Sequence, residues 1–147
     1  MRYKKNVGDM GEDFAAQLLE NSGFSILQRN YRTKVGEIDI IATKDGVLHF
    51  IEVKTRNGDQ YGYPSEAVTQ TKQQRIRKCA EAYLQNRRVT WQKVSFDVYE
   101  IMTDLIENCM GGGVCTAGPD RLFALGWKAG RYLSKRIFRG VFRASEL

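Results

Sequence analysis

Residues that build disulfide frameworks and zinc sites are scarce in this sequence. Of 147 residues, one is histidine and three are cysteines. A structural zinc ion takes about four such ligands, so we do not expect a zinc site. An odd number of widely spaced cysteines gives no disulfide framework either, and we predict reduced thiols. These four residues are His49, Cys79, Cys109 and Cys115.

Long apolar runs are also missing. No run approaches the roughly 20 residues that a membrane span requires. The first ten residues, MRYKKNVGDM, lack the apolar region of a signal peptide. We therefore expect a cytoplasmic protein. The composition, with 42% hydrophobic and 27% charged residues, is typical of one soluble globular domain.

Positive charge is concentrated near the end of the chain. The formal net charge is +6. Residues 121–143 contain seven basic residues and no acidic one, whereas residues 1–120 contain 16 basic and 16 acidic residues. A basic balance favours nucleic acid or anionic lipid as a partner, but here it does so only for the tail.

Apolar periodicity and end signals predict six elements in the body of the chain. Phe14 and Leu18 stack one turn apart in a first helix, and Pro64-Ser65 is a start signal for a second. The expected elements are a helix within 8–24, a strand at 24–32, two strands within 37–56, a helix within 61–88 and a strand at 94–102. The order helix-strand-strand-strand-helix-strand predicts an α/β fold, a mixed sheet flanked by helices.

The stretch CMGGGVCTAGP at 109–119 indicates a linker, because its glycines favour neither helix nor strand. We expect a domain at 1–101, a Gly-rich linker at 102–120 and a basic amphipathic tail at 121–147.

Charged residues interrupt the two apolar strands of EIDIIATKDGVLHFIEVKTR, residues 37–56. Asp45-Gly46 is the strongest short-range signal for a hairpin turn. With that turn, Asp39 lies opposite Glu52 and Glu37 lies opposite Lys54. All four then emerge on one face, because side chains alternate along a strand.

Facing carboxylates destabilise a sheet unless a positive charge lies between them. A divalent cation supplies that charge, and Mg²⁺ typically uses one or two carboxylates, with water and substrate phosphates completing its shell. Lys54 would then stand beside the metal, where it could contact a phosphate or orient a water.

The alternative is an amphipathic surface hairpin with a Glu37–Lys54 ion pair and two solvated carboxylates. Apolar residues on both faces of these strands favour a central position in a sheet instead. Central strands do not carry carboxylates without partners. The apolar neighbours are Ile38, Ile40, Ile41, Phe50, Ile51 and Val53.

The motif GEIDIIA followed by FIEVKTR matches the Asp…Glu-x-Lys signature of the PD-(D/E)XK nuclease superfamily. The surrounding blocks, with YGYPSEAVTQTKQQRIRKCAEAYL and SFDVYEI, resemble the uncharacterised bacterial YraN family, which is similar to archaeal Holliday-junction resolvases. The resemblance covers roughly residues 8–101. It implies a restriction-endonuclease-like fold and metal-dependent cleavage of phosphodiester bonds.

By this resemblance, Asp39 and Glu52 take the role of metal ligands for Mg²⁺ or Mn²⁺, and Lys54 that of the catalytic lysine. Glu12 matches the first-helix acid that commonly joins such sites. The alternative for Glu12 is a helix-start glutamate favoured by the helix dipole. Lys72 lies on the apolar stripe of the second helix, where it either snorkels to solvent or points to an anionic site. The family has a lysine in this block, which favours the site.

Further candidates could contact nucleic acid. Arg56 and Arg75 could neutralise phosphates, although a solvated helix face explains a single arginine as well. Tyr61 and Tyr63 could stack on exposed bases or pack locally. His49 falls on the face opposite Glu52 and is expected to be structural.

The tail at 121–143 separates into an apolar and a basic side on a helical wheel. Such a helix would bind nucleic acid, an anionic membrane surface or a protein groove. A helix packed on the body and a tail that does not fold are the alternatives. Three glycines, each costing about 1 kcal/mol inside a helix, argue against a regular helix. They are Gly126, Gly130 and Gly140.

The leading hypothesis is therefore a metal-dependent nuclease acting on DNA, with branched or structured DNA among its substrates. A non-catalytic nucleic-acid-binding module with the same fold is the alternative, and a membrane-surface adaptor acting through the tail is a third. The sequence leaves the oligomeric state open, a homodimer included.

Overall fold

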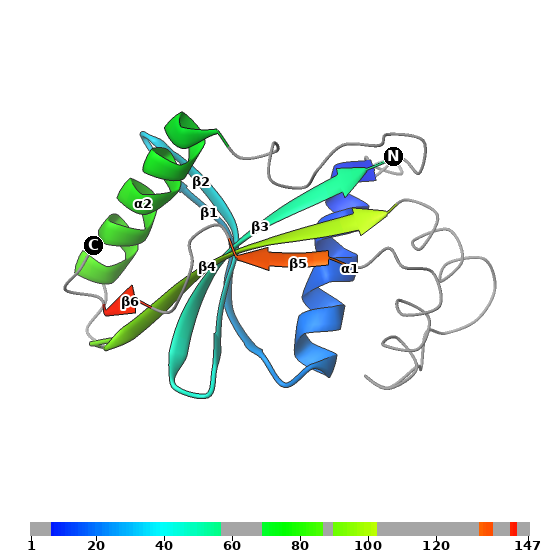
Figure 1. Ribbon diagram of the computed structural model, residues 1–147, viewed down its shortest axis with the longest axis horizontal. Coiled ribbons are helices and arrows are strands. Elements are labelled where there is room, and N and C mark those ends of the chain that lie inside the picture. Colours follow the sequence, from blue (N-terminus) through cyan, green and yellow to red (C-terminus); the bar gives the residue numbers. More distant parts are fainter. Residues whose placement is uncertain (1–6, 57–68, 87–89, 103–132, 137–141, 144–147) are drawn as a thin grey trace, which may run out of the picture.

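The computed structural model describes residues 7–56, 69–86, 90–102, 133–136 and 142–143 (Figure 1). The elements are α1 (Val7–Asn21), β1 (Ser25–Thr33), β2 (Gly36–Lys44), β3 (Val47–Arg56), α2 (Gln70–Gln85), β4 (Lys93–Met102), β5 (Leu133–Arg136) and β6 (Phe142–Arg143). The first six follow the order expected from the sequence. The start signal at 64–65 lies outside the described residues. Thr69 is the N-cap of α2, and its side chain accepts a hydrogen bond from the backbone N–H of Lys72.

The strands form one mixed sheet in the order β1-β2-β3-β4-β5, and β6 also pairs with β4. β1, β2 and β3 are antiparallel neighbours, whereas β3 and β4 are parallel. A parallel pair needs a long crossover connection, and α2 lies in it. The predicted α/β fold with a mixed sheet is confirmed.

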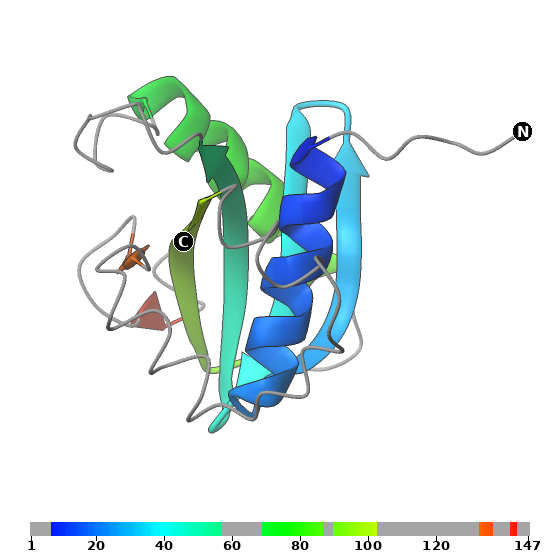
Figure 2. The same cartoon turned by 90° about the vertical axis from the view of Figure 1, so that its right-hand side faces the viewer.

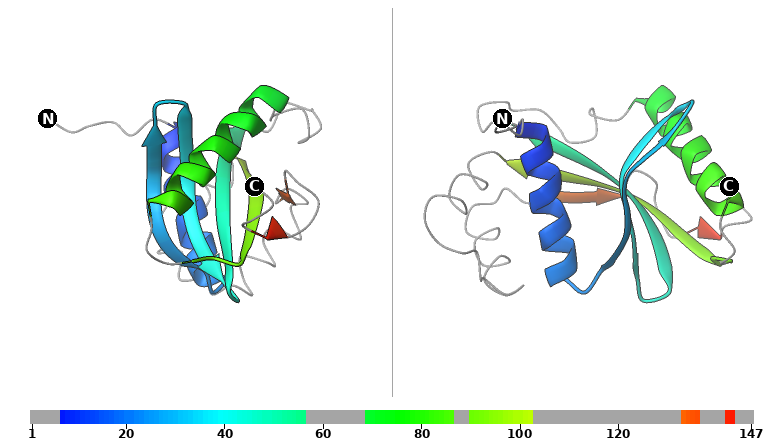
Figure 3. Two further views of the ribbon diagram at one scale, coloured as in Figure 1. Left: turned by 90° about the vertical axis from the view of Figure 1, so that its left-hand side faces the viewer. Right: turned by 180° about the vertical axis from the view of Figure 1, so that it is seen from behind.

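The two helices cover opposite faces of the sheet (Figures 2 and 3). The core is accordingly divided into two apolar clusters. On the α1 side the buried members are Ala15, Ala16, Leu18, Leu19, Ile40, Ala42, Ile51, Val53, Tyr99 and Ile101. On the α2 side they are Ile38, Ile41, Leu48, Phe50, Ile76, Cys79, Ala80, Tyr83, Val94, Phe96 and Val98.

The hairpin turn between β2 and β3 lies at Asp45-Gly46, as predicted. Both residues have positive φ, 51° and 75°, which the tight type I′ hairpin turn requires. From this turn the strands pair from Lys44–Val47 to Ile40–Ile51, so the predicted register is confirmed over this length.

Pairing between β2 and β3 stops at Ile40–Ile51, although both strands continue. β2 stays paired with β1 as far as Gly36, and β3 stays paired with β4 as far as Arg56. Figures 1 and 3 show the result: β1 and β2 run toward α2, while β3 and β4 run toward α1. We call this opening, bordered by Asp39 on β2 and Glu52 on β3, the fork.

Gly11 brings α1 close to the end of β3. A Cβ added at this buried glycine would overlap Oγ1 of Thr55 and lie 3.2 Å from its Cβ. The close approach requires glycine, and it places the start of α1 beside one branch of the fork.

The described part of the tail is not helical. Leu133–Arg136 and Phe142–Arg143 are strands that pair antiparallel with β4, so a continuous helix over 121–143 is wrong at these residues. The outer edge of β4 offers unpaired backbone groups that a strand can satisfy, whereas the glycines weaken a helix. The linker at 102–120 and most of the tail lie outside the described residues, apart from Met102 at the end of β4.

Cys79 is buried and free, as predicted for a reduced thiol, while Cys109 and Cys115 lie outside the described residues. No helix within the described ranges is both long and apolar enough to cross a membrane.

A candidate metal and phosphate site in the fork

Two carboxylates are buried where the sheet opens. Asp39 and Glu52 are each 6% exposed, in a region that is otherwise apolar. Burying a carboxylate is costly unless it has hydrogen-bonding or charged partners, so the partners of each decide what the fork can do.

The side chain of Asp39 accepts a backbone hydrogen bond where the pairing of β2 with β3 has stopped. Its Oδ2 accepts a hydrogen bond from the backbone N–H of Val53 at 2.8 Å, just beyond the last paired residues. Burial and then the charge of Glu52 raise the pKa of Asp39 to about 7, against the lowering effect of the Val53 N–H. The ionised form of Asp39 is therefore disfavoured below about pH 7, because the carboxylate is buried and a second carboxylate stands close by.

Glu52 is held by two lysines from different elements. Lys72, on α2, donates a hydrogen bond from Nζ to Oε1 of Glu52. Nζ of Lys54, on β3, lies 3.5 Å from the same oxygen. The Glu52 side chain is only 7% exposed, whereas the two lysine side chains are about one-third exposed, at 31% and 35%. The ammonium groups therefore connect a buried carboxylate to the surface.

The same contacts shift the pKa values of the two lysines in opposite directions. Burial, and then the neighbouring Lys72, lower the pKa of Lys54. Burial would also lower the pKa of Lys72, but its contacts with Glu52 and Lys54 and the charges of Glu52 and Asp39 outweigh it, so its pKa is raised. Lys72 is thus the lysine that binds the carboxylates more firmly.

Glu12 stands at the edge of this charge cluster. Burial raises its pKa, Arg29 opposes the shift, and the carboxylates of Asp9, Glu37 and Glu52 add to it. In the parts of the chain that the structure describes, no three side chains of the His, Cys, Asp or Glu types lie close enough together to hold a metal ion. The charge of Glu12 therefore affects the carboxylates of the fork electrostatically. Among the described residues, the fork itself contains the two carboxylates of Asp39 and Glu52.

The surface ion pair considered as an alternative does not form. Glu37 pairs with Arg32 on β1, at 3.2 Å, and Lys54 pairs with Glu52 instead. The parting of β2 from β3 separates Glu37 from the strand it was expected to face. The expectation that Glu37 lies beside Lys54 is wrong for this reason.

The structure also places the other candidates. Lys72 reaches Glu52 and does not merely snorkel to solvent. Arg75 is exposed on α2, with its Cβ 3.5 Å from the position that a Cβ on Gly36 would take. The side chain of Arg56 and the loop tyrosines Tyr61 and Tyr63 lie outside what the structure describes.

A second polar cluster, formed by His49, Asp97 and Ser95, was not predicted from the sequence. Nδ1 of His49 lies 2.6 Å from Oδ2 of Asp97, and the hydroxyl of Ser95 lies 3.1 Å from the other carboxylate oxygen of Asp97. Phe24 packs edge-on against the His49 ring at a centroid distance of 5.0 Å. The alternation of Ser95 and Asp97 in an apolar strand was a visible signal for a polar partner.

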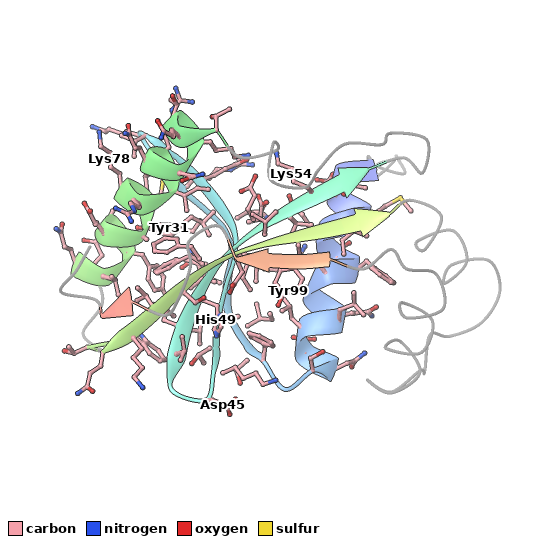
Figure 4. All side chains as sticks on the ribbon, in the orientation of Figure 1. Tyr31, Asp45, His49, Lys54, Lys78 and Tyr99 are labelled. Carbon is pink, nitrogen blue, oxygen red and sulfur yellow. The ribbon has the colours of Figure 1, made fainter. Side chains whose placement is uncertain are left out.

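This second cluster is separate from the fork. Phe24 belongs to the packing of the α1 face, whereas Glu52 is bound from α2, so His49 lies on the opposite face, as expected. His49 and Lys54 also lie toward opposite ends of β3 (Figure 4). The contacts of His49 with Asp97 and Phe24 fit the structural histidine expected from the sequence.

Comparison with known proteins gives consistent matches. Residues 11–101 match the model of a family described as the uncharacterised protein family UPF0102. The chain is similar to a UPF0102 protein of Dictyoglomus thermophilum, 48% identical over 98 residues, which are 67% of this chain and 83% of that protein. UPF0102 proteins of Clostridium perfringens (strain SM101 / Type A) and Rhodococcus opacus are 47% and 46% identical, over 68% and 69% of this chain and 82% and 86% of theirs.

Proposed function

The chain belongs to the uncharacterised protein family UPF0102, and from the geometry of the fork we propose that it is a metal-dependent nuclease that hydrolyses phosphodiester bonds in DNA. Branched or otherwise structured DNA is among the proposed substrates, and the proposed location is the cytoplasm. The observation that carries the proposal is the burial of Asp39 and Glu52 together, each 6% exposed, where the sheet opens.

The donor set of the fork suits a hard divalent cation. Asp39 and Glu52 offer carboxylate oxygens, which Mg²⁺ and Mn²⁺ prefer, and Mg²⁺ commonly takes one or two protein carboxylates with water and phosphate completing its shell. The raised pKa of Asp39, due to burial and to Glu52, means that its negative charge is destabilised where it stands. A cation binding both residues would remove that repulsion, so Asp39 and Glu52 are the proposed metal ligands.

The chemistry then divides among residues of the fork. The bound cation would supply positive charge that activates water and neutralises charge developing at phosphorus. Lys54, two residues after Glu52 on the same strand, would stabilise developing negative charge on the phosphate. Its pKa, lowered by burial and by Lys72, also makes it the better of the two lysines for handling a proton.

Two further residues would support the reaction from outside this centre. Lys72 would contact a phosphate oxygen, and Glu12 would add negative field from the start of α1. Arg56 and Arg75 remain proposed phosphate contacts along the DNA backbone. The order of elements and the Asp…Glu-x-Lys arrangement support placing the chain in the restriction-endonuclease-like superfamily.

The second candidate is a nucleic-acid-binding module without catalysis. One observation favours it: among the described residues the carboxylate cluster has two members, and a lysine already holds Glu52. A pure binding module would need only an uncharged acceptor for the N–H of Val53 at position 39. It would gain nothing from a second buried carboxylate, Glu52, beside it, and this favours the enzyme.

A cleavage panel tests the proposal. Duplex, single-stranded, flap and four-way-junction DNA would each be incubated with the full chain in Mg²⁺, in Mn²⁺ and in EDTA. Metal-dependent cleavage should disappear in Glu52→Gln. It should persist in the matched control Glu37→Gln, whose exposed carboxylate pairs with Arg32. DNA binding without cleavage of any substrate in either metal would leave the binding module as the better explanation.

A further inference from the structure

We propose that Lys72 is a built-in counter-cation of the fork, which holds Glu52 when no divalent cation is bound and must release it before a metal can bind both carboxylates. The inference rests on the proposed metal site and adds a competitor to it. Lys72 acts here as a positioning residue, since it controls the availability of Glu52.

The contact geometry is the first support. Oε1 of Glu52 accepts the hydrogen bond of Lys72 and lies 3.5 Å from Nζ of Lys54. The side chain of Glu52 is 7% exposed, so little water competes for this oxygen. A cation that binds Glu52 through Oε1 therefore has to displace an ammonium group.

The position of Lys72 on α2 is the second support. Its backbone is fixed in the first turn, because its N–H donates to the side chain of the N-cap Thr69 at 3.3 Å. Ile76, one turn later on the same stripe, is buried in the core. The side chain itself is 35% exposed, so the ammonium can leave Glu52 toward solvent while the helix keeps its place.

The charge balance is the third support. When both carboxylates are ionised, as metal binding requires, their two negative charges equal the two positive charges of Lys54 and Lys72. A divalent cation that binds the carboxylates neutralises them in place of the two ammonium groups. They then provide a positive surface for one phosphate group, so metal binding would prepare the fork for its substrate.

Calorimetric titration of Mn²⁺ into the full chain tests this proposal. Lys72→Met should bind Mn²⁺ about tenfold tighter than the wild type or more, because one charge-assisted hydrogen bond no longer has to be broken. Lys54→Met is the matched control: it removes the same charge near the same oxygen, but a longer contact, at 3.5 Å, than the one that Lys72 makes. Its gain in affinity should be clearly smaller.

Thermal melting gives an independent readout. In EDTA, Lys72→Met should melt below the wild type, because Glu52 loses its partner. Saturating Mn²⁺ should then raise the melting temperature of the variant more than that of the wild type. If Lys72→Met does not fold, Lys72→Gln offers a neutral replacement with the same expected gain in affinity.

The outcomes separate this inference from the proposed function. One outcome is that the wild type binds Mn²⁺ while Lys72→Met binds it no tighter, or gains no more affinity than Lys54→Met does. That result overturns the counter-cation and leaves the metal site standing. A purely structural Lys72 would lower the melting temperature in EDTA without raising the affinity. Absence of Mn²⁺ binding in the wild type and in both lysine variants would overturn the metal site and this inference together.

Discussion

Replacing Asp39 by asparagine should stabilise the metal-free protein, and the gain should grow with pH. Burial and the neighbouring Glu52 raise the pKa of Asp39 from 3.8 to about 7. In the unfolded chain the carboxyl loses its proton near its ordinary pKa, so between these two values the folded state holds the extra proton. The contribution of this proton to the free energy of unfolding is fully present below about pH 4. It is lost as pH rises to about 7, and above that value the loss levels off.

The magnitude follows from the two pKa values. Each pH unit between them corresponds to about 1.4 kcal/mol, so the charge of Asp39 costs up to about 4 kcal/mol above pH 7. Asparagine carries no charge, and its amide oxygen can still accept from the N–H of Val53. The neutral hydrogen bond is weaker by about 1 kcal/mol, which leaves a net gain of about 3 kcal/mol at pH 8.5. At pH 5 most of this gain should be gone.

Urea unfolding of wild type and Asp39→Asn in EDTA, at pH 5 and pH 8.5, measures this difference. The control is Glu37→Gln, which neutralises an exposed carboxylate on the same strand and should show no comparable dependence on pH. A stability difference that stays flat between the two pH values would refute the reasoning. So would a variant that loses several kcal/mol at pH 8.5, because Asp39 would then be a satisfied structural partner.

The same geometry supports four other predictions. Mn²⁺ binding measured by calorimetry should disappear in Asp39→Asn and in Glu52→Gln, and unchanged binding in both would contradict the site. Removing residues 121–147 should preserve Mn²⁺ binding, because Asp39 and Glu52 are retained. The plot of log DNA affinity against log salt concentration should become shallower, by about 0.9 in slope for each phosphate that the tail neutralises in the full chain. An unchanged slope would mean that the tail does not touch DNA. Gly11→Ala should lower the free energy of unfolding by about 1–3 kcal/mol through the clash with Thr55, measured in urea, whereas a neutral effect would mean that α1 can shift away from β3. Asp97→Asn should destabilise the fold by about 1–3 kcal/mol through the weakened interaction with His49 while Mn²⁺ affinity stays unchanged, and a fall in Mn²⁺ affinity would link the two polar clusters.

The elements and the hairpin were predictable because local signals determine them. Asp45-Gly46 favours a type I′ turn, which needs positive φ at both positions. With the turn placed there, the register of β2 against β3 follows as far as Ile40–Ile51. The apolar stripe through Ile76 placed Lys72 on the buried side of α2. Burial of the charged pair followed from the apolar residues around it.

Features set by contacts distant in sequence were not predictable. The parting of β2 from β3 depends on how each strand packs on a different helix, and no residue in the hairpin indicates it. For this reason Glu37 was expected beside Lys54 and was found with Arg32. The His49–Asp97 pair depends on the register of β3 against β4, which the intervening helix leaves undetermined. In the tail, the wheel pattern favoured a helix, but pairing with the free edge of β4 determined residues 133–136.

The hydrogen bond from Val53 to Asp39 has a consequence for comparing relatives of this protein. Asp39 satisfies a backbone group that the parted strands leave unpaired, so any chain with this fork needs an acceptor there, whether it is an enzyme or not. An Asp or Asn at this position in a relative is therefore weak evidence of activity. Glu52 binds side chains instead, namely those of Lys54 and Lys72. Under the proposed function, a relative without catalysis would be free to change Glu52 and Lys72 together, and the joint replacement of these two residues would then mark it.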